Sequence, residues 1–486
     1  MASPVRVRTS FAIVLAVLTA TGSVASPARA RVLTAVPGAS SGQPGYYRDL
    51  VDQLVPGDTL SLPAGTYGDR LSLSSVQGQP GAWITVLGPA SGPPAVITTS
   101  SLCCNTVQLG DTWYVAIENI TVDSAGLDGI DGINAGGTYT HDILIENCTL
   151  IGQNHDQSVV GISTKSPAWN WTIRGNTILG AGTGLYLGNS IGNFPFINGL
   201  IEGNLVMDTI GYNMEIKWQL PYDSFSWVTQ LPPEPHTTII RDNVWIKSKT
   251  GWDPAIVAGA RPNVLVGGFP DSGVGSRDRY DIYGNFFYKN PDEALFQASG
   301  RSSVHDNVFV GASNGNYSLY FVDHDLNLKM AHVYNNTVYT TTGRGIGFGS
   351  TARQEDAVVG NLIFADDRPL YGSITNQRDN AVAPSADAPL DLDQPSLTLG
   401  QMDFYPLASC AVCSGSALDL SAFTGETAYD RDFNGTSKGA FAFRGAYAGS
   451  GTNPGWHPDA TKKPLGASTG TADATAPASV RDLIGR

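Results

Sequence analysis

A short strand pattern with an Asn at its centre recurs along most of the chain. Apolar and polar residues alternate around this Asn, as in ILIENCTL, TIRGNTIL and VYNNTVY. The recurring Asn residues are Asn119, Asn147, Asn176, Asn204, Asn243, Asn285, Asn307, Asn336 and Asn361. Six of the eight spacings are 22–29 residues and the other two are 39 and 42. Periods of about 20 to 50 residues are typical of stacked supersecondary units. Because the alternation has the period of a strand, the pattern predicts a β-solenoid.

The repeated Asn is expected to be structural. Asn tolerates left-handed backbone at a tight corner, and its amide can bond to the same Asn in the next coil. Such a ladder satisfies polar groups that would otherwise be buried without partners.

A second recurring strand begins with a small residue and then alternates. Its predicted inward residues are Ile133, Ile162, Leu185, Met214, Val264, Leu295, Leu319 and Ile346. Alternation then turns two columns of residues to solvent on one face of the solenoid. One column reads Asn134, Ser163, Tyr186, Glu215, Leu265, Phe296, Tyr320 and Gly347, and the other reads Gly136, Lys165, Gly188, Lys217, Gly267, Ala298, Val322 and Gly349.

The repeats define an all-β fold and a simple domain organisation. We predict a right-handed parallel β-helix over residues 31–450, with about 9–11 coils. Residues 46–55 form a short amphipathic pattern that is expected to give a helix capping the open N-terminal end. Residues 451–486 are rich in Gly, Thr, Ala and Pro without periodicity, which predicts a disordered tail.

Residues 1–30 have the pattern of an export signal. Arg6 and Arg8 precede an apolar run at 11–20, and Ala28-Arg29-Ala30 is a small-x-small cleavage motif. We therefore expect a secreted protein, extracellular or periplasmic after removal of the signal, with no membrane span. A monomer is expected.

The segment VPGDTLSLPAGTYGDRLSLSSVQGQPGAWITVLGPASGPPAVI, from Val55, resembles the first coils of pectate-lyase-like β-helix proteins. It is most similar to the chondroitinase B and alginate lyase group in its GDT, GTY and G-x-P-G-x-x-I-T elements. The resemblance implies a pectin-lyase-like fold and an extracellular polysaccharide as the partner.

The formal net charge of the chain is -14. Nucleic acid is therefore not expected as a partner, because binding to phosphate backbones rests on clustered Lys and Arg. An acidic polysaccharide would also be repelled unless local cations reverse the field in the groove.

Two lysines in the trough of small residues provide such cations. A uronate lyase neutralises the sugar carboxylate, removes the C5 proton with a base and protonates the departing C4 oxygen. We predict Lys217 as the base, Lys165 or a metal ion as the carboxylate ligand and Tyr186 as the acid. Glu215 lies on the same face and could instead pair with Lys217 and keep it charged and inert.

Two coils are longer than the others, so their extra residues must leave the solenoid as loops. The insertions are WQLPYDSFSWVTQLPPEP after Lys217 and SKTGWDPAIVAGARP after Lys247. Exposed aromatic rings stack on sugars, whereas the alternative is that these rings fold back onto the solenoid wall. The predicted substrate-binding residues are Glu215, Trp218, Tyr222, Trp227, Trp252, Arg261, Phe296 and Tyr320.

Acidic residues gather in the loops before the first strands of the trough. Asp128, Asp131 and Asp156 are candidate ligands for calcium, because hard cations prefer loop carboxylates. Loops of β-solenoids are also simply rich in Asp.

The five Cys residues cannot all pair within the chain. Cys410 and Cys413 are close enough for a local bridge. Cys148 has two alternatives, a bond to Cys103 or Cys104 or a buried free thiol.

These features predict a secreted polysaccharide lyase acting on an acidic, uronate-containing polymer by β-elimination. A glycoside hydrolase on the same fold is one alternative, although no carboxylate pair at hydrolytic spacing is evident. The other is a non-catalytic glycan-binding or surface β-helix protein, since fold alone does not imply function.

Overall fold

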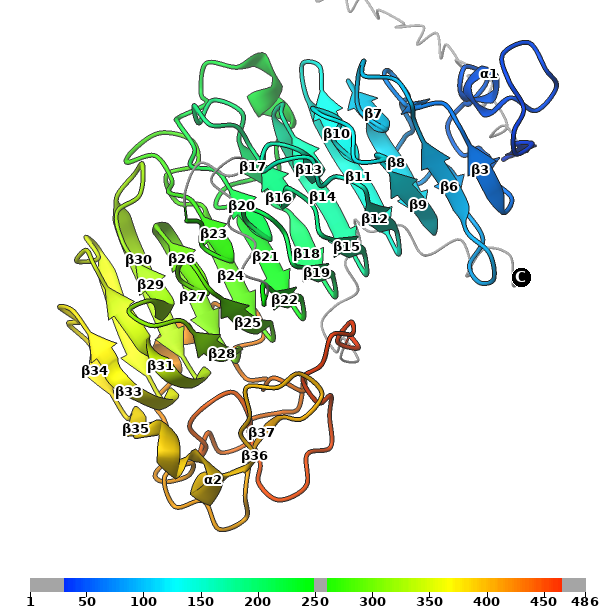
Figure 1. Ribbon diagram of the computed structural model, residues 1–486. Helices are drawn as coiled ribbons and strands as arrows, with labels where there is room; N and C mark the ends of the chain where they lie inside the picture. The colour runs from blue at the N-terminus through cyan, green and yellow to red at the C-terminus, as the bar shows by residue number, and fades with distance from the viewer. Residues whose placement is uncertain (1–29, 249–259, 466–486) are drawn as a thin grey trace, which may run out of the picture.

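The computed structural model describes residues 30–248 and 260–465, and most of this chain winds into a right-handed parallel β-helix (Figure 1). Each coil contributes strands to three rows, and each strand pairs in parallel with its equivalent in the next coil. The predicted fold class is therefore confirmed.

The first row runs the length of the solenoid. It consists of β1 (Val32–Thr34), β2 (Thr59–Ser61), β5 (Ile84–Leu87), β8 (Trp113–Glu118), β11 (Thr140–Glu146), β14 (Ala168–Arg174), β18 (Leu200–Glu202), β21 (Thr237–Arg241), β24 (Arg279–Tyr283), β27 (Gly300–His305), β30 (Leu328–Tyr334), β32 (Glu355–Val359) and β34 (Gln377–Arg378), with β17 (Phe196–Ile197) beside β14.

The second row carries the Asn corners. It consists of β3 (Gly65–Tyr67), β6 (Ala95–Thr98), β9 (Ile120–Asp123), β12 (Thr149–Ile151), β15 (Thr177–Leu179), β19 (Leu205–Met207), β22 (Val244–Ile246), β25 (Phe286–Asn290), β28 (Val308–Ala312), β31 (Thr337–Phe348), β33 (Leu362–Tyr371) and β35 (Ala381–Ala383).

The third row contains the predicted trough. It consists of β4 (Leu71–Ser72), β7 (Val107–Gly110), β10 (Ile133–Gly136), β13 (Val160–Thr164), β16 (Thr183–Leu187), β20 (Met214–Ile216), β23 (Val264–Val266), β26 (Phe296–Ala298) and β29 (Tyr317–Phe321), and it continues through the last parts of β31 and β33.

The interior is a continuous stack of apolar side chains. Ile133, Ile162 and Leu185 are aligned in adjacent strands and are fully buried, as the alternation predicted. Residues from all three rows belong to the same core cluster. Because every strand in the middle of a row has a neighbour on both sides, the backbone polar groups are satisfied along the axis.

The Asn ladder exists, but it begins two coils later than the sequence predicted, at Asn176 instead of Asn119. Eight buried or half-buried side chains are linked amide to amide at 2.8–3.0 Å, namely Asn176, Asn204, Asn243, Asn285, Asn307, Asn336, Asn361 and Asn380. In the preceding coil Cys148 occupies the ladder position and its backbone N–H donates to Asn176. Asn119 and Asn147 lie one residue earlier, where φ is positive. The first of two neighbouring positions therefore has the left-handed backbone of the corner, and the second provides the amide of the ladder. The sequence analysis had assigned both roles to one Asn.

The N-terminal end of the solenoid is covered. Helix α1 (Tyr47–Val51) buries Tyr47 and Val51 over the first coils, within the predicted 46–55 range but shorter than it. After β35 the chain leaves the solenoid, so the predicted boundary at 450 is later than the last coil. This segment contains η2 (Ser385–Asp387), α2 (Ala388–Asp391), the antiparallel pair β36 (Leu392–Gln394) and β37 (Asp403–Pro406), and η3 (Ser421–Phe423).

The C-terminal segment packs against the outer side of the second row (Figure 1). It also reaches the solenoid through buried lysines. Lys438 pairs with Asp306 at 2.7 Å, and Lys463 pairs with Asp242 at 2.6 Å. Residues 451–465, predicted to begin a disordered tail, are therefore packed, and 466–486 lie outside the described residues.

The predicted export signal lies outside the described residues apart from Ala30. Within the described parts of the chain, no helix is long and apolar enough to cross a membrane.

Cys410 and Cys413 form the predicted local disulfide, and Cys103 is bonded to its neighbour Cys104. Cys148 is a buried free thiol, and burial raises its pKa to about 12.

We predict that Asn243→Ala lowers the free energy of unfolding by about 2–5 kcal/mol, because it orphans buried partners on both sides. The Asn243 amide donates to Ile201 and Asn285, and its carbonyl accepts from the Asn204 backbone and side chain. Denaturant unfolding measures the change. Exposed Asn154→Ala is the matched control, with an expected change within about 0.5 kcal/mol. Equal effects of the two variants would contradict a structural ladder.

Candidate functional site

The outward face of the third row carries the predicted columns in register. Ser163 is aligned with Tyr186, and Tyr186 with Glu215, on adjacent parallel strands. Lys165 and Lys217 each follow the end of their strand, and their backbone N–H groups donate to the preceding coil. The two lysines therefore lie on the same face, as predicted.

A pocket of about 670 Å³ opens on this face over β13, β16 and β20. Five of the residues named from the sequence line it, namely Asp156, Lys165, Tyr186, Glu215 and Arg261. The same wall contains residues that the sequence analysis did not identify, namely Gln157, Ser158, Asn189, Ser190 and Phe194. These belong to the turns beside β13 and β16, where no periodic signal distinguishes a pocket wall from an ordinary turn.

Tyr186 is suited to donate a proton. Burial, together with the nearby charge of Glu215, raises the pKa of Tyr186 to about 12. The phenol therefore keeps its proton at neutral pH, and an oxygen that leaves a substrate in this pocket could take it.

Glu215 and Lys217 form a close ion pair, which is the alternative that the sequence left open. Lys217 Nζ lies 2.8 Å from Glu215 Oε1, and both side chains are largely covered. Burial raises the pKa of Glu215, although the charge of Lys217 opposes this. Lys217 Nζ also lies 6.0 Å from the centre of the Tyr186 ring, so Glu215, Lys217 and Tyr186 form one cluster.

Lys165 is paired with Asp131, which removes Asp131 from the predicted metal ligands. Asp131 Oδ2 accepts from Lys165 Nζ at 2.8 Å, from Ser163 and from Asn134, while Oδ1 accepts the Val160 backbone N–H. This carboxylate is buried and fully engaged in the wall of the row. The Lys165 side chain remains half exposed above it.

Arg261 enters the pocket from the end of the long coil that follows β22. Its guanidinium lies 5.8 Å from the centre of the Tyr212 ring, and Nη1 donates to the Ala260 carbonyl. Its Nε is buried without a hydrogen-bond partner among residues 30–248 and 260–465. Arg261 is half-buried as a whole, so its charged side chain lines the pocket although this Nε is covered.

The loop after β20 does not present most of its aromatic rings to the pocket. Tyr222 and Trp227 are buried in a cluster with Trp169 and Ile197 on the solenoid wall. The prediction that these two rings bind substrate is wrong, because the loop can bury them against Trp169. Trp218 is half-buried beside Gly192, and Trp252 lies outside the described residues.

Two further predicted contacts are misplaced. Phe296 is aligned with Val264 and Leu319 and points into the core, so Gln297 takes the outward position instead. The sequence alignment slipped by one residue here because Leu295 and Phe296 are both apolar. Tyr320 does face outward, but it lies three strands beyond Glu215 and stacks on Tyr317 at 5.0 Å.

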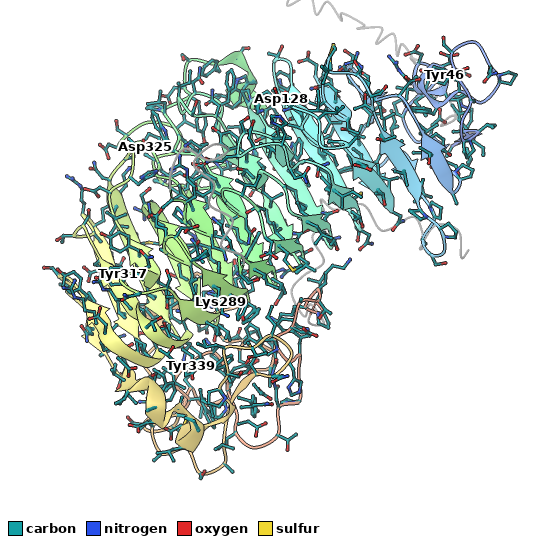
Figure 2. The ribbon with its side chains drawn as sticks, in the orientation of Figure 1. Tyr46, Asp128, Lys289, Tyr317, Asp325 and Tyr339 are labelled. Atoms are coloured by element: carbon teal, nitrogen blue, oxygen red, sulfur yellow. A yellow bond between two sulfur atoms is a disulfide. The ribbon has the colours of Figure 1, made fainter. Side chains whose placement is uncertain are left out.

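Asp128 and Asp156 do come together, with His155 as the third member instead of Asp131. Their donor atoms lie within 4.8 Å of one another at the rim of the pocket, where Figure 2 labels Asp128 among the loops. Hydrogen bonds from Ser158 and His155 lower the pKa of Asp156, although burial opposes the shift. Two carboxylates and an imidazole do not fit calcium well, because calcium prefers six to eight oxygen ligands. Calcium therefore stays a prediction.

No protein-family model and no curated protein matches the chain. Solved structures do. Pectate lyase Pel9A aligns at 15% identity with a TM-score of 0.52, over 87% of this chain and 96% of that one. An alginate lyase from Paenibacillus sp. str. FPU-7 aligns at 16% identity with a TM-score of 0.45, over 67% and 97%. At such identities the likeness to Pel9A shows the fold alone, which is that of the pectate-lyase-like parallel β-helices.

The loop after β20, which contains Tyr222 and Trp227, is held in place by the buried His236. His236 Nδ1 lies 3.0 Å from both oxygens of Asp278, which also accepts from Tyr222. Burial disfavours the imidazolium, but Asp278 outweighs it and raises the pKa of His236 above its ordinary value. A raised pKa stabilises the fold below the unfolded-state pKa of about 6.5 and loses this effect as pH rises through the folded-state value.

We therefore expect His236→Gln to destabilise the protein most at about pH 5, with the difference from wild type shrinking by about pH 8. Denaturant unfolding at both pH values measures this difference. A destabilisation that grows with pH would mean that His236 is neutral in the folded protein.

Proposed function

We propose that the protein is a secreted, monomeric polysaccharide lyase that cleaves a uronate-containing polymer by β-elimination. The observation that carries this proposal is the Arg261 guanidinium, with a buried unpartnered donor, in a pocket that also contains Lys165 and Tyr186. In a protein of net charge -14, two cations converging on one pocket suit an anionic sugar.

The proposed roles follow from the geometry. Arg261 and Lys165 hold the uronate carboxylate and neutralise its charge, which makes the C5 proton more acidic. Lys217 in its neutral form removes this proton, and the electron pair forms the C4–C5 double bond. The C4–oxygen bond breaks, and the departing oxygen takes the Tyr186 proton. Glu215 positions Lys217 through their 2.8 Å contact.

The covered Tyr186 phenol sets the alkaline limit of the pH profile. Burial raises the pKa of Tyr186 to about 12, so the proposed acid keeps its proton at neutral and moderately alkaline pH. We therefore expect no loss of kcat through deprotonation of this acid up to about pH 10. Measurement of kcat against pH tests this, with thermal unfolding to confirm the fold, and a kcat that already falls between roughly pH 7 and 9 in the folded protein would exclude Tyr186 as the acid.

The assay for the proposed reaction is the ultraviolet absorbance of the unsaturated uronate formed from a panel of acidic polysaccharides, with calcium or with a chelator. Arg261→Ala is expected to reduce kcat/KM by about 100-fold or more, because a charge-assisted contact strengthened in the transition state is lost. Arg431→Ala, at an arginine far along the chain in the C-terminal segment, is the matched control. Full activity in Arg261→Ala would remove the carboxylate-binding role.

A glycoside hydrolase is the second candidate, and one observation favours it. Asp156 and Glu215 both line the pocket, and their surroundings shift their pKa values in opposite directions, down for Asp156 and up for Glu215. Such divergence is typical of an acid and base pair. New reducing ends without unsaturated product, abolished by Glu215→Gln, would replace the lyase by the hydrolase. Binding without either product would favour the non-catalytic glycan-binding protein.

A further inference from the structure

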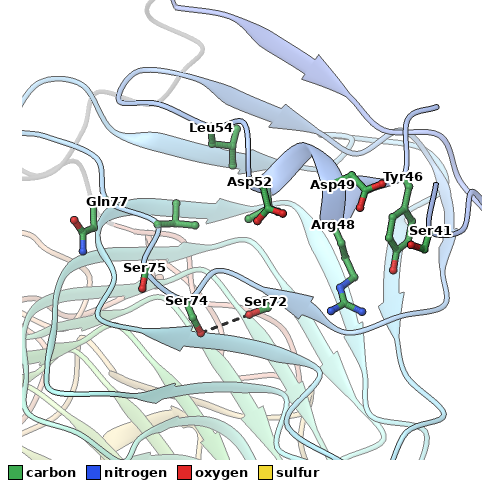
Figure 3. Close-up of a pocket in the computed structure, with 12 residues that line it drawn as sticks. Ser41, Tyr46, Arg48, Asp49, Asp52, Leu54, Ser72, Ser74, Ser75 and Gln77 are labelled. Carbon is green, nitrogen blue, oxygen red and sulfur yellow. Dashed lines mark hydrogen bonds between the residues drawn. The ribbon is translucent and has the colours of Figure 1, made fainter. Parts of the chain in front are cut away.

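A second pocket lies on the same row, at the N-terminal end of the solenoid. It has a volume of about 750 Å³ and is enclosed between α1 and the turn that follows β4. Figure 3 shows Arg48 and Asp52 reaching from α1 toward Ser72 and Ser74 on the solenoid. None of the residues that were predicted to bind substrate and that lie within 30–248 or 260–465 lines this pocket.

The two pockets are joined by the register of the third row. Strand pairing aligns in succession Ser72, Gln108, Asn134, Ser163, Tyr186 and Glu215. Four strand spacings separate Ser72 from Tyr186, which is roughly 19 Å at about 4.8 Å per coil. A linear polymer lying along the row would therefore pass from one pocket to the other.

The surface between the pockets consists of polar side chains and a column of glycines. Gln108 donates to Asn134, and Asn134 donates to Ser163 at 2.6 Å, so these side chains bond to one another along the row. The neighbouring column is Gly110 and Gly136. A Cβ at Gly110 would lie 3.3 Å from the Ser74 hydroxyl, and one at Gly136 would lie 3.3 Å from the Gln108 amide, so a side chain at either position would crowd the polar groups of this path.

The chemistry of the second pocket suits sugar units. The Asp49 and Asp52 carboxylates can accept hydrogen bonds from sugar hydroxyl groups, and the serine hydroxyls can donate or accept them. Arg48 offers a guanidinium to a carboxylate. Tyr46, two residues before Arg48, holds the wall in place because its hydroxyl donates to Asp69 Oδ2 at 2.8 Å.

We propose that this second pocket is a distal subsite that binds sugar units of the same polysaccharide chain whose reacting unit lies at Tyr186. The inference rests on the proposed function for the identity of the polymer. Arg48 pairs with a uronate carboxylate, while Asp52 and the serines bind hydroxyl groups. A polysaccharide chain gains binding affinity from the second pocket only when it is long enough to span both pockets.

The test compares long uronate polymers with their di- and trisaccharides, on the full protein and on Arg48→Ala. We expect Arg48→Ala to weaken binding and raise KM about tenfold for long chains, with kcat unchanged. The short oligosaccharides, which cannot span about 19 Å, should show no change. Ser74→Trp, which fills the pocket while Arg48 itself is unchanged, should have the same selective effect. Arg431→Ala is the control, and thermal unfolding confirms that each variant is folded.

Calorimetric binding, measured separately from turnover, distinguishes the two proposals. Length-dependent binding that is lost in Arg48→Ala, without any product, would retain the subsite and reject the lyase. Product formation that is unaffected by Arg48→Ala and Ser74→Trp would retain the lyase and reject the subsite. An equal effect on long and short chains, or no binding of any polymer, would also overturn the subsite.

Discussion

The structure depends on one constraint, the in-register parallel pairing of equivalent residues from coil to coil. The buried ladder from Asn176 to Asn380 reinforces that register, because each amide bonds both to its counterpart and to backbone carbonyls. A slip of one residue would turn the apolar core outward and break every amide contact at once. The solenoid therefore provides a fixed support for the long segments outside it that contain little regular structure.

The same register determines what the surface can do. A polar residue on one strand is carried about 4.8 Å from its counterpart on the next, so isolated side chains become columns. Tyr186 and Glu215 are brought together in this way, the turns beside β13 and β16 add a wall, and the coil after β22 adds Arg261. The result is an extended polar face with a pocket near its middle and another at its end.

The sequence predicted the parts that repeat and missed those that do not. Alternation placed Ile133, Leu185, Lys165 and Lys217 correctly because each has equivalents in other coils. It misplaced Phe296, where two adjacent apolar residues make either register plausible, and it could not tell that Asp131 is a buried structural acid. The burial of Tyr222 depends on Asp278, far along the chain, and the pocket beside Arg48 depends on how α1 docks. Neither leaves a periodic signal.

The central claim is that the pocket beside Tyr186 and Arg261 binds a uronate. A crystal structure of Lys217→Ala with a uronate oligosaccharide tests it most directly, because the variant should bind substrate without turning it over. The account predicts a sugar carboxylate within hydrogen-bond distance of Arg261 and a glycosidic oxygen beside the Tyr186 hydroxyl. An oligosaccharide bound elsewhere on the solenoid, with this pocket left to solvent, would contradict it.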